Sequence, residues 1–159
     1  ECAEFSFTDE DWISLGGVAG AGAFVYAMAT GSNGRLYVGG SFSIADTSVV
    51  NFVAQWDGNR WISLGNGMNS DVRALATDGD VLYAGGAFTE AGGVNACRIA
   101  KWDGKTWSAL GSGMNSTVFS LALLNGQLYA GGAFTNAGGV GVSRIARWDG
   151  PHGPGLRRV

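Results

Sequence analysis

Side-chain oxygens that could hold a metal ion gather in a loop that occurs twice in the sequence. The loop reads Gly67-Met-Asn-Ser-Asp71 in one copy and Gly113-Met-Asn-Ser-Thr117 in the next. Carboxylate and amide oxygens suit Ca²⁺, a hard cation that takes about six to eight oxygen ligands. We therefore treat Asp71 and Asn69 as candidate metal ligands and Asn115 as the matching amide, although the sequence contains no calcium-loop motif.

Histidine-dependent chemistry is excluded from the body of the chain. The only histidine is His152, which lies among the last residues of the sequence. A Ser-His-Asp triad and a histidine-ligated zinc site each need an imidazole beside the other groups. An enzyme built from these residues would therefore have to be a hydrolase without a catalytic histidine.

Other candidate residues stand where the repeated copies disagree. Tyr26, Arg73 and Phe119 occupy one equivalent position, and Asp71/Thr117 and Glu90/Asn136 are two further unlike pairs. Scaffold positions should match between copies, whereas positions that bind a ligand are free to differ. The candidate ligand-binding residues are thus Tyr26, Asn69, Asp71, Arg73, Asn115, Thr117 and Phe119. The alternative is that they are ordinary solvated loop residues.

These residues are positioned by a repeat of fixed length. Tyr37, Tyr83 and Tyr129 are spaced 46 residues apart, and so are the tryptophans 56, 102 and 148. In the middle copy, strand patterns cover residues 72–77, 81–84, 97–102 and 107–110, with a loop over 87–95. Turns containing glycine and aspartate separate the strands. A role in these turns is sufficient to explain Asp57, Asp103 and Asp149. No segment has a sustained helical period. Four short antiparallel strands per repeat predict an all-β protein built from β-propeller blades.

The motifs of the repeat resemble those of kelch-like propeller proteins. Leu82-Tyr-Ala-Gly-Gly86, then Trp102-Asp103, then Trp107 follow the kelch order, with Trp-Asp-Gly where kelch repeats have Tyr-Asp. The resemblance covers residues 12–150 and is to the kelch-like repeats that are common in secreted bacterial proteins. It implies that the strand over 72–77 is innermost, the strand from Trp107 is outermost, and the protein is extracellular or at the bacterial cell surface.

The phase of the repeat divides the chain unevenly. Residues 2–15 supply two outer strands, 25–64 and 72–110 are complete blades, and 118–149 supply three strands. Residues 151–159 have no strand pattern, and we expect a disordered tail. Propellers have about four to eight blades, so three cannot close a ring. We expect a two-fold homodimer of six blades, in which the strand Trp12–Leu15 of one subunit completes the last blade of the other. The rival interpretation is a fragment of a longer, single-chain propeller.

One face of the propeller is expected to bind ligands. The loop after the Gly-Gly strand and the loop entering the innermost strand share that face and are the long loops. In the first copy the entering loop, Gly17–Phe24, is longer and has no Met-Asn. It departs entirely from the other copies, so we expect this blade to differ.

Composition narrows the partners. Charged residues are 14% of the chain and the net charge is −3, with no Lys/Arg-rich stripe in the repeats, so nucleic acid is not an expected partner. No apolar stretch is long enough to span a membrane. Cys2 and Cys97 occupy equivalent positions in different copies, so we expect two unpaired thiols.

The leading interpretation is a binding or scaffold module that recognises a protein, a glycan or a small molecule through the loop face and central channel. The alternative is a metal-assisted hydrolase of esters, lactones or phosphotriesters. Some propeller lactonases and phosphotriesterases hold calcium in the channel, and the oxygens of Asn69, Asp71 and Asn115 resemble that arrangement. A third possibility is a purely structural repeat of a large surface protein.

Overall fold

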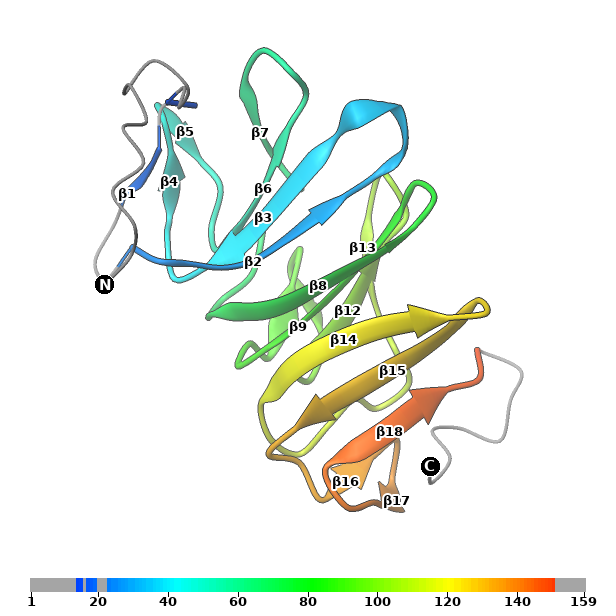
Figure 1. Ribbon diagram of the computed structural model, residues 1–159. Helices are drawn as coiled ribbons and strands as arrows, with labels where there is room; N and C mark the ends of the chain where they lie inside the picture. Colours follow the sequence, from blue (N-terminus) through cyan, green and yellow to red (C-terminus); the bar gives the residue numbers. More distant parts are fainter. Residues whose placement is uncertain (1–13, 16, 20–22, 151–159) are drawn as a thin grey trace, which may run out of the picture.

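The described part of the chain is an open arc of antiparallel sheets (Figure 1). The structure is a computed structural model, and it describes residues 14, 15, 17–19 and 23–150. The predicted strand over 12–15 falls largely outside these residues, as do the tail 151–159 and Cys2. In the described ranges, no helix is long and apolar enough to cross a membrane.

Three blades follow one another along the arc. The first blade contains β2 (Val25–Thr30), β3 (Leu36–Gly40), β6 (Val53–Trp56) and β7 (Trp61–Ser63). The middle blade contains β8 (Val72–Asp78), β9 (Val81–Gly86), β12 (Ile99–Trp102) and β13 (Trp107–Ala109). The last blade contains β14 (Val118–Leu124), β15 (Gln127–Gly132) and β18 (Ile145–Trp148). A 3₁₀ turn, Ser32–Gly34, lies in the hairpin between β2 and β3. The predicted propeller blades are therefore present, as an open and partial propeller.

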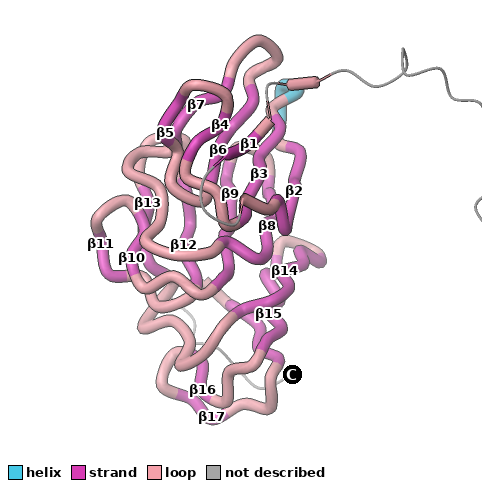
Figure 2. The backbone as a smooth tube through the Cα atoms, turned by 90° about the vertical axis from the view of Figure 1, so that its left-hand side faces the viewer, coloured by secondary structure: helices cyan, strands magenta, loops and turns pink. Residues whose placement is uncertain are grey.

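The strand order within each blade sets an inner and an outer edge. The strands β2, β8 and β14 begin their blades and pack side by side, with β8 between the other two. Figure 2 shows them along one side of the arc, with β13 on the opposite side. The inner strands therefore form the wall that would face a central channel.

Short ladders fold the long loops against the blades. The expected loop over 87–95 contains β10 (Glu90–Ala91) and β11 (Val94–Asn95), and its counterparts contain β4 (Ile44–Ala45) with β5 (Ser48–Val49) and β16 (Asn136–Ala137) with β17 (Val140–Gly141). Met68 and Met114 form isolated β-bridges to Ala91 and Ala137, the alanines of the ladders that follow them in sequence.

The entering loop of the first copy is less different than its sequence predicts. Val18 in β1 (Val18–Ala19) pairs with Ala45, as Met68 pairs with Ala91. Gly17 accepts a backbone hydrogen bond from Asp46, as Gly67 accepts one from Gly92. The prediction that this loop departs entirely was therefore wrong for its first residues, because backbone pairing does not need the Met side chain.

Neighbouring blades are held together by a valine packed against a glycine. A Cβ atom added at Gly39 would lie 2.5 Å from Cγ1 of Val72 and 3.4 Å from Cδ1 of Leu75. One added at Gly85 would lie 2.6 Å from Cγ1 of Val118 and 3.4 Å from Cδ1 of Leu121. Both valines are fully buried. The second strand of each blade thus needs glycine so that the next blade can approach closely.

Paired tryptophans close the outer edge of each four-stranded blade. The rings of Trp102 and Trp107 have centroids 5.3 Å apart, and Trp56 and Trp61 repeat that separation. Nε1 of Trp107 donates to the carbonyl of Leu64 on the preceding blade at 2.7 Å. The outermost strands therefore connect adjacent blades as well as closing their own.

Candidate functional site

A β-bulge interrupts each innermost strand where it meets the second strand. The register shifts between Val25 and Ala27, between Val72 and Ala74, and between Val118 and Ser120. The extra residues are Tyr26, Arg73 and Phe119, the position at which the sequence copies disagree. Bulges re-aim a side chain and are enriched beside active sites. The structure thus gives these three unlike side chains a common backbone setting. We call these three residues, together with the residue two positions before each of them, the rim; the preceding residues are Phe24, Asp71 and Thr117.

The rim carries aromatic rings and one ion pair. The guanidinium carbon of Arg73 lies 4.4 Å from the ring centroid of Tyr26, a cation–π distance. Nη2 of Arg73 also donates to Oδ2 of Asp71 at 2.8 Å. Phe119 holds the same position on β14, with its side chain 54% exposed. The arrangement offers flat apolar surfaces beside a guanidinium that is already neutralised by a carboxylate.

Phe24 is a rim residue that sequence reasoning missed. Its carbonyl accepts the backbone N–H of Ser41 at 2.9 Å, just as the carbonyl of Asp71 accepts that of Ala87. Phe24 therefore occupies the position of Asp71 and Thr117. Its ring is 61% exposed and stacks on Tyr26, with centroids 6.2 Å apart and planes at 19°. Alignment of the copies backward from the Gly-Gly strands would have found it, because the longer first loop hides the equivalence in a forward alignment.

The two loop asparagines hold the long loops in place. Oδ1 of Asn69 accepts the backbone N–H groups of Thr89 at 2.9 Å and Glu90 at 3.1 Å, and Nδ2 donates to Oγ1 of Thr89 at 2.8 Å. Asn115 makes the same three bonds to Thr135 and Asn136. We call this arrangement the asparagine clamp. The predicted ligand-binding set therefore divides into clamp residues and rim residues.

The predicted metal ligands are engaged with protein groups. Asn69 uses both its amide atoms in the clamp, and Asp71 pairs with Arg73. Within the described ranges, no group of three or more His, Cys, Asp or Glu side chains is placed to hold an ion. Calcium binding at Asp71 and Asn69 stays a prediction. Cys97 is free and half-buried.

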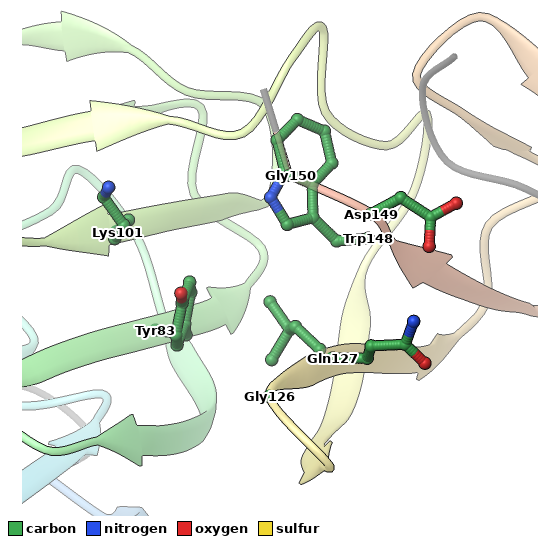
Figure 3. A pocket seen from close by; sticks show the side chains of 8 residues that line it. Tyr83, Lys101, Gly126, Gln127, Trp148, Asp149 and Gly150 are labelled. Atoms are coloured by element: carbon green, nitrogen blue, oxygen red, sulfur yellow. The ribbon is translucent and has the colours of Figure 1, made fainter. Parts of the chain in front are cut away.

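A hollow lies between the middle and last blades, at the ends opposite the loops. It measures about 200 Å³, and Figure 3 shows Tyr83 and Lys101 on one blade and Trp148 and Asp149 on the other. Burial and the nearby charge of Asp78 raise the pKa of Tyr83. The corresponding gap between the first two blades is bridged, because Asp80 accepts a hydrogen bond from Ser32 at 2.7 Å. The hollow is thus a local difference between two blade junctions.

Comparisons with known proteins agree on the fold. A family profile described as a β-propeller domain of unknown function (DUF5122) matches residues 112–148. The computationally designed protein Ika8 is 18% identical, with a TM-score of 0.52, over 83% of this chain and 35% of its own. The designed protein Ika4 is also 18% identical, with a TM-score of 0.50, over 87% of this chain and 73% of its own. The chain therefore spans about a third of Ika8. A search of curated proteins gives no match. Together with the sheets described above, these likenesses confirm the predicted all-β propeller.

Proposed function

We propose that this propeller arc is a binding module that recognises a protein or a glycan at the rim and loop face. The observation that carries the proposal is the bulge, which recurs in every blade beneath a different exposed side chain. A bulge releases its extra residue from the ladder and re-aims that side chain, so each blade presents a different side chain from the same backbone setting.

The chemistry of the rim suits such ligands. Phe24 and Tyr26 form a stacked, half-exposed aromatic surface, and Arg73 lies on one of these rings. Tyrosine and arginine are enriched among the residues that dominate protein interfaces. Flat rings fixed by stacking lose little conformational entropy on binding, which favours a rim made of aromatic side chains.

The test uses a glycan array and a peptide array, both probed with the wild-type chain and with the double variant Tyr26→Ala/Arg73→Ala. We expect the double variant to lose at least about tenfold in affinity for whatever the wild type binds. Lys101→Ala, which alters the hollow on the opposite side, is the matched control and should bind like the wild type. Equal binding by the double variant, or loss of binding in the control, would contradict the proposal. Circular dichroism should show that all three proteins are folded.

A further inference from the structure

The two open faces of the arc carry the two halves of the junction that joins its blades. Inside the arc, Val72 and Leu75 of the middle blade pack on Gly39 of the first blade, and Val118 and Leu121 of the last blade pack on Gly85. We call the valine and the leucine three residues after it, or the residues at these positions in another blade, the knob. We call the glycine the socket. Each internal junction joins a knob to the socket of the preceding blade.

The first blade presents a knob with no socket. Val25 and Met28 hold the positions of Val72 and Leu75, but they are 42% and 67% exposed, whereas Val72 is fully buried. An apolar hollow of about 240 Å³ lies beside them, lined also by Leu36 and Val38. Nothing in the described part of the chain covers this knob.

The last blade presents a socket with no knob. Around a Cβ added at Gly131, the only described atoms within 4 Å belong to Ser120, whereas Gly39 and Gly85 each meet a valine there. Ile145 is 45% exposed, although its counterparts Val53 and Ile99 are buried. The positions of Gly131 and Ile145 are therefore uncovered in the last blade, although the equivalent positions in the other two blades are buried at internal junctions.

A hydrogen bond to Leu15 gives a third observation at the open end of the first blade. Nε1 of Trp61 donates to the carbonyl of Leu15 at 2.7 Å, as that of Trp107 donates to Leu64. Leu64 lies just after β7, the outermost strand of the first blade, and this blade precedes the one that contains Trp107. Leu15 thus lies beside the first blade where the outermost strand of a preceding blade would finish.

We propose that a second copy of this chain closes the arc, with the knob of each copy in the socket of the other. A two-fold axis satisfies both open faces at once. It gives a ring of twice the three blades described above, within the range of about four to eight blades that propellers adopt. The same closure places the second copy's Tyr26 beside Phe119, as Tyr26 lies beside Arg73 within the arc, so the rim is incomplete without the second copy.

Light scattering coupled to size-exclusion chromatography tests the proposal on the 16.4 kDa chain. We expect the wild type to have twice that mass. In Met28→Asp, each closure would bury an unpaired carboxylate, so the dissociation constant should rise by about 100-fold or more. Val49→Asp is the matched control, since Val49 is also 67% exposed but lies on β5, away from the knob.

The possible outcomes separate cleanly. A dimer that Met28→Asp dissociates and Val49→Asp leaves intact supports the closure. A monomeric wild type, a series of larger open oligomers, or a dimer that survives Met28→Asp overturns it. Circular dichroism of Met28→Asp should match the wild type, because the side chain is exposed in the single arc.

Discussion

At both the outer and the inner edge of the blades the backbone repeats, but the side chains repeat only at the outer edge. At the outer edge, Trp56 pairs with Trp61 as Trp102 pairs with Trp107, at the same 5.3 Å separation. At the inner edge, the bulge recurs while the residue on it changes completely. Buried rings and inter-blade hydrogen bonds constrain the outer edge. The bulge residue is released from the ladder, so its identity is free for binding.

The largest expected effect comes from removing an outer tryptophan. Trp107→Ala should lower the free energy of unfolding by about 3–5 kcal/mol, because it leaves a cavity and the carbonyl of Leu64 loses its donor. Trp107→Phe keeps a ring and should cost about 1–3 kcal/mol. Urea unfolding followed by circular dichroism measures both. If the two variants were equally unstable, the hydrogen bond rather than packing would govern this edge.

The next effect comes from filling a socket. Gly85→Ala places a methyl group 2.6 Å from Val118 Cγ1, and overpacking of this kind costs about 1–3 kcal/mol. Gly141→Ala is the control, since nothing lies within 4 Å of its added Cβ. The same urea titration should leave the control near the wild type. A neutral Gly85→Ala would mean that the blades can separate without loss of stability.

The asparagine clamp should contribute less. Asn69→Ala and Asn115→Ala each remove three hydrogen bonds at partly exposed groups, and we expect each to cost about 1–2 kcal/mol. Thermal melts with calcium chloride and with chelator separate the clamp from a metal site. If calcium stabilised the wild type but not Asn69→Ala, Asn69 would be a metal ligand.

The rim should tolerate substitution. Arg73→Ala loses a half-exposed ion pair and one cation–π contact, and we expect a change within about 1 kcal/mol. Urea unfolding beside Trp107→Ala gives the contrast between the edges directly. A loss as large as that of Trp107→Ala would make Arg73 part of the scaffold instead.

The smallest expected effect is a loss of stability at acidic pH. The backbone N–H groups of Thr106 and Lys105 donate to Asp103 and hold its pKa below the ordinary value, and Arg60 and Asn59 do the same for Asp57. A folded pKa below the unfolded one gives stability at higher pH that is lost as the pH falls through the folded pKa. Melting temperatures should therefore decline slightly below about pH 4. Asp103→Asn should flatten that decline, and an unchanged decline would exclude this turn as its source.

Sequence reasoning reached the fold because the repeat encodes it in glycines, turns and paired tryptophans. Four-residue turns such as residues 103–106 have strong local signatures, and the carboxylate of Asp103 does accept backbone hydrogen bonds as expected. The sequence also showed that Tyr26, Arg73 and Phe119 share one position at which the copies disagree, and the role of that position in binding stays a prediction. The bulge beneath it could not be found, because it depends on the register between strands and not on a residue type.

The short loop ladders were missed for a related reason. A pairing such as Glu90 with Asn95 has two residues per strand and no alternating pattern to detect. The asparagine clamp was not predicted, because an amide oxygen looks the same in sequence whether it faces an ion or a backbone N–H. Only the fold places Asn69 beside Thr89.

The recurring bulge also makes this architecture easy to reprogram. Each blade offers one side chain whose replacement leaves the strand ladder, the sockets and the outer tryptophans untouched. A library randomised at residues 26, 73 and 119 would therefore vary the surface of the rim almost independently of folding. Evolution had the same option available, since duplicating a blade adds one more exchangeable contact without redesigning the rest.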